Sequence, residues 1–281
     1  IMEDLIIELK PGDKITNKEL CKIFSVSGSS GMRRSVKNNC LVLIAYYTHE
    51  KYNDRWKIGG KEFLYTGMGS IGDQKLDYKQ NKVLYESNTS KNQLFLFEVF
   101  KQNEYTYQGR VILGGEPFIE EQEDKNQHLR KVYIFPLKLK DSGSQVPTEL
   151  SYMDNLQESQ KKKCKKYSIE ELRNIIKNSK NKLPAERRVI STHYERNQYI
   201  VECTKKLAKG FCDLCNKQAP FKNKKKEHYL EVHHINWLSK GGEDSMRNVA
   251  ALCPNCHKKM HILKNNAEIE KLKIIADKRH I

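Results

Sequence analysis

Four cysteines in the last quarter of the chain form two pairs whose spacing suits a metal ion. Cys212 and Cys215 are separated by two residues, Cys253 and Cys256 repeat that spacing, and 37 residues lie between the pairs. Two such pairs can supply four thiolates in a tetrahedron around one zinc ion. Because thiolates would fill every position, we expect this zinc to be structural and the chemistry to occur elsewhere.

Histidines are interleaved with these cysteines. His233 and His234 lie between the two pairs, and His257 and His261 follow the second pair. The last two are four residues apart, which places them one turn apart on the same face of a helix. Imidazoles can hold a divalent ion, and a neutral imidazole can accept a proton near pH 7. The spacing of His257 and His261 suits two ligands of one ion, although His261 also fits a solvated residue at a helix end.

The segment LEVHHINWLSKGGEDSMRNVAALCPNCHKKMH resembles the HNH, or ββα-metal, nucleases, and the likeness extends over about fifty residues. The resemblance implies a β-hairpin followed by a helix, with a divalent ion between them. It implies that His234 is the general base, that Asn248 holds the hairpin or the base, and that the ion is bound by His233, His257 and His261. Phosphodiester hydrolysis needs a deprotonated water and positive charge near the phosphorane, which this set can supply. The ion could be zinc, nickel, cobalt, manganese or, with retained waters, magnesium.

The chain is strongly basic. Its 281 residues include 51 Lys and Arg against 35 Asp and Glu, a formal net charge of +16. Residues 161–230 alone contain 20 Lys and Arg against 7 Asp and Glu. Beyond a merely solvated surface, this excess predicts a polyanionic partner, and the HNH resemblance implies that this partner is double-stranded DNA. The sequence has neither a long apolar stretch nor a signal-peptide pattern at its start, so we expect no membrane partner and a cytoplasmic location.

The chain is expected to be of the α+β class, in three parts. Four apolar runs of strand length, at 40–47, 93–100, 105–113 and 131–139, predict a strand-rich domain over residues 1–140. Residues 141–210 are charged and helical in pattern, and we expect a basic helical linker. One of its helices should begin at Ser168 with Glu171 completing a capping box, and another should run from about 191 to 209. Residues 211–281 form the expected nuclease domain with its structural zinc.

A second resemblance covers roughly residues 5–140. The order and spacing of several short motifs look like the SRA (SET- and RING-associated) domain, a curved, barrel-like sheet of the PUA-like class. These motifs are Gly31-Met-Arg-Arg-Ser35, Tyr52-Asn-Asp54, Tyr65-Thr-Gly67, Gly72-Asp-Gln-Lys-Leu76, Asn81-Lys-Val-Leu84 and Tyr105-Thr-Tyr107-Gln-Gly109. The basic loop usual after the Tyr-Thr-Gly motif is replaced by a short turn.

SRA domains flip a modified cytosine from the duplex and bind it between aromatic rings. The resemblance implies that Tyr52 and Tyr65 stack on the base, that Asp54 accepts from its N4 amino group, and that Thr66 lies near the base or its methyl group. The expected base is 5-methyl- or 5-hydroxymethylcytosine. Two alternatives stay open: both tyrosines are ordinary sheet aromatics, or the domain recognises a phosphorothioate backbone.

Together these motifs predict a modification-dependent restriction endonuclease that hydrolyses DNA near modified cytosine. One alternative is an HNH restriction or homing enzyme that reads unmodified sequence. Another is a DNA reader that does not cleave, against which the complete set of His233, His234, Asn248 and His257 argues.

We also expect a homodimer. One HNH site attacks one phosphodiester at a time, and two protomers related by a two-fold axis would present two sites to antiparallel strands. The apolar face formed by Leu172, Ile175 and Ile176 is a candidate interface, but packing within its own chain explains it better, and the dimer contact would then come from the HNH domain.

Overall fold

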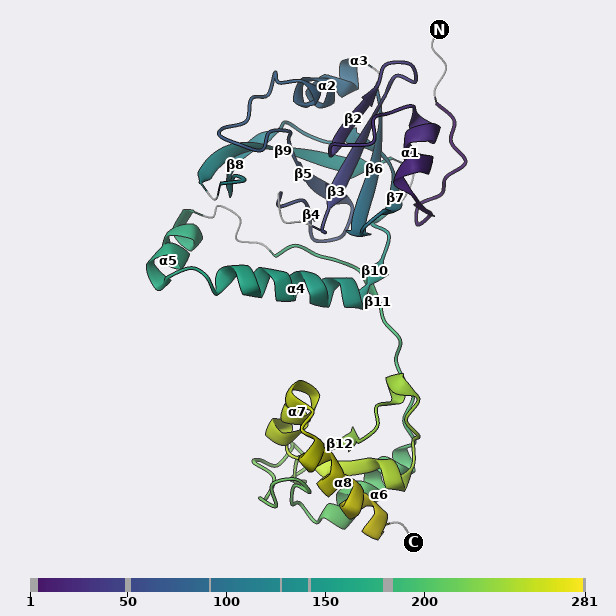
Figure 1. Cartoon of the computed structure of the whole chain (residues 1–281), viewed down its shortest axis with the longest axis vertical. Helices are drawn as coiled ribbons and strands as arrows, with labels where there is room; N and C mark the ends of the chain where they lie inside the picture. Colours follow the sequence, from purple (N-terminus) through teal and green to yellow (C-terminus); the bar gives the residue numbers. More distant parts are fainter. Residues whose placement is uncertain are drawn as a thin grey trace. The chain divides into compact units, whose positions relative to one another are not determined.

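A computed structural model of the chain describes residues 5–48, 52–90, 92–126, 128–140, 143–178 and 184–279. Its contacts divide the chain into two compact units, Ile1–Ser191 and Thr192–Ile281 (Figure 1). The division falls within the predicted linker 141–210, so that the first part of this segment belongs to one unit and the last part to the other.

A nine-stranded sheet forms the centre of the N-terminal unit. The strands follow the order β2-β3-β6-β7-β9-β5-β4, with β1 paired to β7 and β8 paired to β9. Their bounds are β1 Lys14–Ile15, β2 Met32–Ser35, β3 Cys40–Tyr46, β4 Arg55–Trp56, β5 Glu62–Thr66, β6 Gln93–Lys101, β7 Glu104–Leu113, β8 Phe118–Glu123 and β9 Leu129–Leu139. All four strands expected from apolar runs are therefore confirmed. Among the described residues the path ends at β2 and β4, and the sheet is open where the sequence suggested a barrel-like form.

The central strands β3 and β6 pair in parallel and are apolar along their length because both faces of the sheet are covered. On β3, Leu41 and Leu43 face one core cluster, whereas Val42 and Ile44 face another. β6 divides its residues in the same way, as the alternation of side chains along a strand requires.

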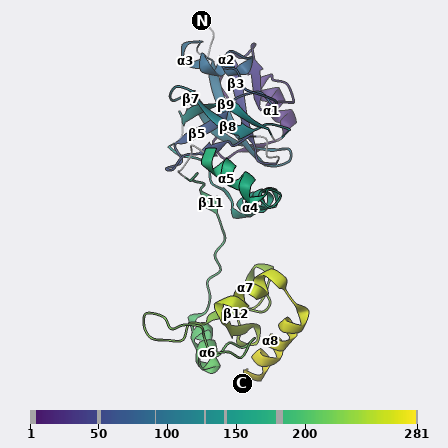
Figure 2. The ribbon, with the colours of Figure 1, turned by 90° about the vertical axis from the view of Figure 1, so that its left-hand side faces the viewer.

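Short helices cover the two faces. Helix α1 (Asn17–Phe24) begins with a capping box in which Thr16 and Glu19 each bond the other's backbone, and it packs on the same cluster as Val42. Helices α2 (Gln80–Tyr85) and α3 (Ser87–Ser90) follow β5, and α2 packs against the opposite cluster. Figure 2 shows these elements from a second direction.

The first part of the predicted linker folds onto the N-terminal unit. Helix α4 (Leu150–Cys164) is followed by α5 (Ile169–Asn178), which starts at the expected capping box of Ser168 and Glu171. Strand β10 (Thr148–Glu149) then pairs in parallel with β11 (Val189–Ile190).

Two buried or half-buried contacts attach this segment to the sheet. The Tyr167 hydroxyl donates to Glu123 on β8 at 2.7 Å. The Arg187 guanidinium donates to the fully buried carboxylate of Glu98 on β6 at 2.7 Å. A buried arginine that loses its carboxylate partner leaves an unpaired charge, so this ion pair fixes where the segment returns to the sheet.

The C-terminal unit places a hairpin among helices. Its elements are α6 (Gln198–Ala208), β12 (Glu231–His234), the 3₁₀ turns η1 (Leu238–Lys240) and η2 (Met246–Asn248), β13 (Val249–Leu252), α7 (Pro254–Leu263) and α8 (Asn266–Arg279). The helix expected from about residue 191 begins only at Gln198, where the Asn197 side chain accepts from the Tyr199 amide. The sequence prediction of its start was wrong, because residues 191–197 form no regular secondary structure and the helix is capped at Asn197.

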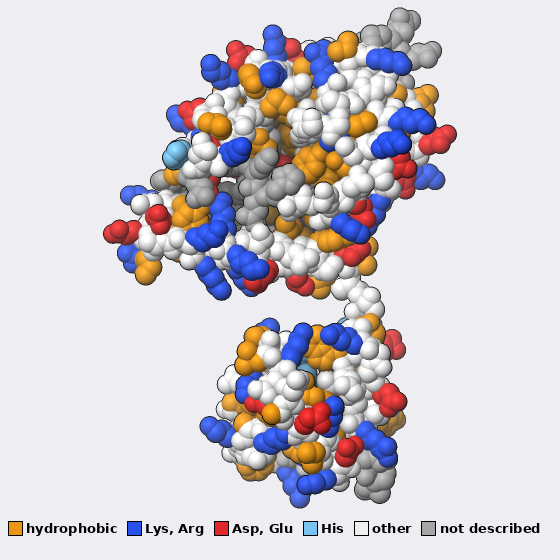
Figure 3. Space-filling view, in the orientation of Figure 1, with side chains coloured by type: hydrophobic (Ala, Val, Ile, Leu, Met, Phe, Trp, Pro, Cys, Tyr) orange, Lys and Arg blue, Asp and Glu red, His pale blue; other side chains and the backbone are white. Residues whose placement is uncertain are grey.

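The surface is rich in Lys and Arg side chains, which Figure 3 shows on both units and around α4 and α5. Within the described part of the chain, no helix combines the length and apolar character needed to cross a bilayer.

Candidate active site and base-reading group

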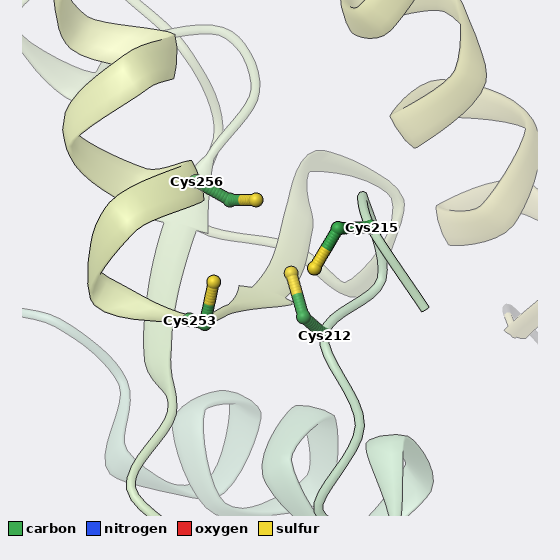
Figure 4. A group of neighbouring side chains, drawn as sticks. All are labelled: Cys212, Cys215, Cys253 and Cys256. Atoms are coloured by element: carbon green, nitrogen blue, oxygen red, sulfur yellow. The ribbon is translucent and has the colours of Figure 1, made fainter. Parts of the chain in front are cut away.

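The four paired cysteines meet at one point of the C-terminal unit. Cys212 and Cys215 lie in a tight turn before the hairpin, Cys253 is the N-cap of α7, and Cys256 lies in its first turn. Their sulfur atoms all lie within 4.8 Å of one another and point into the same space (Figure 4). Four thiols in this arrangement fit the tetrahedral coordination of one zinc ion.

The cysteine turn is fastened to the rest of the unit by Asp213. Its carboxylate accepts two hydrogen bonds from Arg279 on α8, at 2.6 and 2.7 Å, and a third from the Ala251 amide on β13. A two-pronged guanidinium–carboxylate pair is geometrically specific, so the turn is oriented even before an ion is considered.

Three of the four motif histidines come together beside the hairpin. His233 lies on β12 and is buried, with only 2% of its surface exposed, while His257 and His261 lie one turn apart on α7. One ring nitrogen from each of the three lies within 4.8 Å of the others. The rings meet edge to face at centroid distances of 4.7 to 5.2 Å.

Electrostatics favours neutral rings in this group. Burial, together with positive charge on the neighbouring His257 and His261, lowers the pKa of His233 to about 3, so its lone pair is available at neutral pH. The Nδ1 of His257 lies 2.5 Å from a carboxylate oxygen of Glu231, which leaves Nε2 to face the corresponding Nε2 of His261 at 3.1 Å. A carboxylate behind an imidazole is the usual way to set the tautomer of a metal ligand. The donor set therefore fits a divalent ion.

His234 is separate from this group, as the alternation along β12 requires. Its Nε2 lies 2.9 Å from one oxygen of Asp244, and the second oxygen of Asp244 accepts from the backbone amide of Asn197 at 2.6 Å. Burial opposes ionisation of Asp244, but these bonds from Asn197 and His234 hold its pKa below the ordinary value. The carboxylate thus orients His234 and leaves Nδ1 as the nitrogen that can accept a proton.

Asn248 holds the loop that joins the two strands. Its amide nitrogen donates to the carbonyls of Asn236 and Glu243, and its oxygen accepts from the Asn236 amide, all at 2.7 to 2.8 Å. Gly242 lies in the same loop, where a Cβ would stand 2.0 Å from the Asn236 carbonyl oxygen. Only glycine allows so close a backbone contact.

Sequence reasoning missed the two carboxylates Glu231 and Asp244. Glu231 lies two residues before His233, and alternation along a strand places both on one face, which is a usable signal. Asp244 lies in a loop, and no spacing of residues in the sequence predicts the path of that loop.

The residues expected to read a base lie around β4, β5 and β8 of the N-terminal unit. Tyr52 is half-buried, its hydroxyl donates to the Gly69 carbonyl at 3.1 Å, and the Arg130 guanidinium lies 6.0 Å from its ring centre. The Thr66 hydroxyl accepts from the Gln122 side-chain amide at 3.3 Å. Arg130 and Gln122 were not identified from the sequence.

Asp54 is nearly buried beside these residues. One carboxylate oxygen accepts from the Thr66 amide at 2.7 Å. Burial raises the pKa of Asp54 to about 7, Glu98 adds to this rise, and Thr66 and Arg55 oppose it. A carboxyl group in this position can exist in either protonation state near neutral pH.

Tyr65 lies deeper than the sequence suggested. It is 3% exposed, belongs to a core cluster with Phe63, and donates its hydroxyl to the Gly31 carbonyl at 2.8 Å. Its ring has no free face in this arrangement, which differs from the prediction that it stacks on a base. Packing against the core stabilises a large aromatic ring more than exposure would. Its pKa is raised by burial and then by Asp54 and Tyr52, so the three side chains are close enough to interact.

Comparisons with known proteins agree with both units. Residues 11–161 match the family described as "ScoMcrA-like, SRA domain", and residues 212–262 match the HNH endonuclease family. The Type IV methyl-directed restriction enzyme EcoKMcrA of Escherichia coli (strain K12) is 41% identical over 86 residues. That match covers 31% of this chain and 31% of the relative, so this chain spans about a third of that protein's length.

Three solved structures are also similar. The Type IV phosphorothioation-dependent restriction endonuclease ScoMcrA is 16% identical with a TM-score of 0.41, over 97% of this chain and 64% of that one. The modification-dependent restriction endonuclease TagI is 17% identical with a TM-score of 0.38, over 92% and 79%. The SUVH5 SRA domain in complex with hemimethylated CG DNA is 22% identical with a TM-score of 0.39, over 50% and 96%. Because the SRA match alone spans more than half of the 281 residues, the chain belongs to the ScoMcrA-like SRA-domain family and carries an HNH endonuclease domain after it.

Proposed function

We propose that this protein is a restriction endonuclease that binds DNA carrying modified cytosine and hydrolyses a phosphodiester bond nearby. The observation that carries the proposal is the C-terminal geometry: three histidines share one space, and a fourth is held by a carboxylate. The SRA domain that precedes this site in the same chain supports a reader of modified DNA.

His234 is the proposed general base. Its Nε2 is bonded to Asp244, so Nδ1 can take the proton of the attacking water as the phosphorus–oxygen bond forms. Asp244 then stabilises the imidazolium, because a fixed carboxylate lies at the opposite nitrogen. Its second bond, to the Asn197 amide, prevents the carboxylate from turning away.

His233, His257 and His261 are the proposed ligands of a divalent ion, which would supply positive charge to the phosphorane and to the leaving 3′-oxygen. Glu231 holds His257 with Nε2 directed at the other two rings. The four cysteines are the proposed zinc ligands, and zinc there supports the fold.

Tyr52, Asp54 and Thr66 are the proposed reading group for 5-methyl- or 5-hydroxymethylcytosine. A flipped base would stack on Tyr52, and the Asp54 carboxyl group would accept from the N4 amino group. Tyr65 is held in the core by its bond to Gly31, and it would become a stacking partner only if its neighbours separate. Arg130 lies beside Tyr52, is buried, and donates to the carbonyls of Gly69 and Gly72, so it would hold the turn that Tyr52 also bonds.

The test is digestion of one plasmid in four forms: unmodified, with 5-methylcytosine, with 5-hydroxymethylcytosine, and with phosphorothioate linkages. We expect cleavage of the cytosine-modified forms only. Equal cleavage of the unmodified plasmid would refute modification dependence, and cleavage of only the phosphorothioate form would assign a different ligand. The His234→Ala protein is the matched control for contaminating nuclease.

The reading group is tested by Tyr52→Ala and Asp54→Ala, which should remove the preference for modified DNA while leaving cleavage itself. Tyr78→Ala removes an exposed tyrosine outside the group and is the control. Unchanged discrimination in both alanine variants would show that the reading group lies elsewhere.

We also propose that the protein acts as a homodimer on DNA, because restriction requires both strands to be cut by a chain with one HNH domain. On α5, Leu172 and Ile175 are half-buried and Ile176 is 72% exposed, so part of the expected interface packs within its own unit. Light scattering with and without DNA measures the mass. A monomer that only nicks plasmid would contradict the dimer.

A further inference from the structure

A cleft of about 590 Å³ opens next to the three-histidine group. His233 and Asn248 line it together with Trp237, Lys240 and Lys264. Apolar side chains, among them Met260, also line it. The roles proposed above for the histidines and Asn248 do not explain the tryptophan or the two lysines.

Trp237 is placed differently from an ordinary core tryptophan. Its ring centre lies 5.1 Å from that of His261, and the ammonium groups of Lys264 and Lys240 lie 4.5 and 5.3 Å from it. By contrast Trp56, the other tryptophan, is 1% exposed and donates its indole N–H to Glu98. Trp237 is half-buried, so its aromatic surface is available at the side of the cleft.

Hydrogen bonds and a close backbone contact hold the loop that carries Trp237. The Trp237 carbonyl accepts from the amides of Lys240 and Gly242, at 2.8 and 3.0 Å. Asn248 bonds the backbone of the preceding residue from the other side, and Gly242 packs against that same backbone. A side chain on such a loop loses little freedom when it binds, which favours its use in recognition.

We propose that Trp237, Lys240 and Lys264 form a subsite for the nucleotide next to the scissile phosphate of the DNA strand being cut. This inference rests on the proposed nuclease function. The indole packs against the base or deoxyribose, and the two ammonium groups contact the flanking phosphates. Aromatic faces combined with cations are the chemistry that binds single nucleotides of a strand without reading their sequence.

The local charges are consistent with this ligand. Arg247 also lines the cleft, so three cationic side chains face it, against the single carboxylate of Glu243. In the free protein the lysines lie over the indole. A phosphate arriving at the cleft gives each ammonium group a stronger partner than an aromatic face.

Tryptophan fluorescence tests the contact directly. The experiment uses the full-length His234→Ala protein, which should not cut, with plasmid DNA methylated at cytosine C5. Because Trp56 is buried, quenching by acrylamide reports mainly on Trp237, and the Trp237→Phe protein defines the background. We expect DNA to lower the quenching constant at least twofold. If DNA binds, as measured by filter retention, and quenching does not change, the subsite is wrong.

Single-turnover cleavage by the otherwise intact protein provides the second test. Trp237→Ala should lower kcat/KM about fivefold to a hundredfold, the range that loss of one stacking contact implies. Trp237→Phe keeps an aromatic face and should lose less than about threefold by the same reasoning. Wild-type rates in the alanine variant would overturn the subsite but leave the nuclease proposal intact. Absence of any cleavage by the wild type would overturn both.

If Trp237→Ala disrupts the fold, which loss of zinc would reveal, substitution of the two lysines tests the subsite instead. Lys240→Gln and Lys264→Asn should each lower kcat/KM and weaken its salt dependence. Asn is chosen at 264 because the backbone there is left-handed, which Asn tolerates. Lys278→Gln, an exposed change on α8 with the same loss of charge, is the matched control. Equal effects in all three variants would show that the two lysines act only through the overall positive charge of the protein, and this would overturn the subsite.

Discussion

The nuclease site and the base-reading group differ in how their polar atoms are arranged. In the C-terminal unit, ring nitrogens of His233, His257 and His261 converge on one space, all within 4.8 Å of one another. In the N-terminal unit, Asp54 and Tyr65 are buried and bonded to their own backbone surroundings. The three histidines are arranged to bind a ligand, whereas the polar atoms of Asp54 and Tyr65 already bond to the protein backbone.

This difference follows from what each group must bind. Ligands of an ion must converge on one point, and that convergence is built into the fold by the hairpin and α7. A planar base instead needs a slot as thick as a ring, and an empty slot in a core costs stability. The comparison teaches that a metal site can be located in the free protein, whereas a base-reading site is better located by substitution and titration.

The largest effect expected is on the C-terminal unit alone. Cys212→Ser should remove zinc and unfold this unit, because apparent binding energies of structural zinc are about 10–16 kcal/mol. The sheet of the N-terminal unit should remain folded. Metal analysis and fluorescence of Trp56 and Trp237 measure the two units separately. Cys164→Ser, at an exposed thiol on α4, is the control, and retention of zinc in Cys212→Ser would contradict the assignment.

Removal of the base should leave the fold and abolish the chemistry. His234→Ala is expected to lower the single-turnover rate by about 10²- to 10⁴-fold, the usual contribution of a general base. Metal content and DNA affinity should stay near those of the wild type, because a base acts mainly in the transition state. Near-normal cleavage would show that another residue activates the water.

Much of the nuclease site could be predicted because its spacing is local. Two histidines four residues apart on a helix share a face whatever surrounds them, and paired cysteines suit one ion. Asp244 could not be predicted, because its contact with His234 depends on the path of a loop. The start of α6 was placed too early because several residues before it could begin a helix, whereas the Asn197 side chain caps it by accepting from the Tyr199 amide.

The base-reading group was less predictable. Alternation along β5 places Tyr65 on one face of the sheet, but it does not say whether that face is open or covered. In the structure it is covered by core residues, and Arg130 and Gln122 reach the group from β9 and β8. Such contacts join strands that are far apart in sequence, so the spacing of residues along the chain cannot predict them.

A pH titration sharpens the contrast at the N-terminal unit. The pKa of Asp54 is about 7 in the folded state, above its value of about 4 when unfolded, so the folded state binds the proton more tightly between these values. The contribution of Asp54 to the free energy of unfolding is therefore greatest below pH 4. It is lost as the pH rises from there through 7. The loss amounts to roughly 2 kcal/mol between pH 5 and pH 7.

Urea unfolding of the full chain, followed by Trp56 fluorescence in a Trp237→Phe background, measures this loss. Asp54→Asn should flatten the dependence, since the amide cannot ionise. A variant that keeps the wild-type slope would assign the titration to another group.

The smallest effect expected concerns Asp244, which acts only through its neighbour. Asp244→Ala should lower the cleavage rate about 10- to 100-fold, as loss of a residue that orients a functional imidazole commonly does. Asp244→Asn should lose less, but not nothing, because one amide oxygen cannot accept from both His234 and the Asn197 amide.

A double-mutant cycle separates orientation of the base from support of the loop. If Asp244 serves the reaction by holding the imidazole, Asp244→Ala should have almost no further effect on the rate once His234 is already alanine. If it serves mainly to fasten α6 to the loop, the two losses should add, and the free energy of unfolding should fall in both backgrounds. Single-turnover rates of the four proteins, with metal content measured for each, distinguish these outcomes. Additive losses would leave His234 as the base but remove its carboxylate from the mechanism.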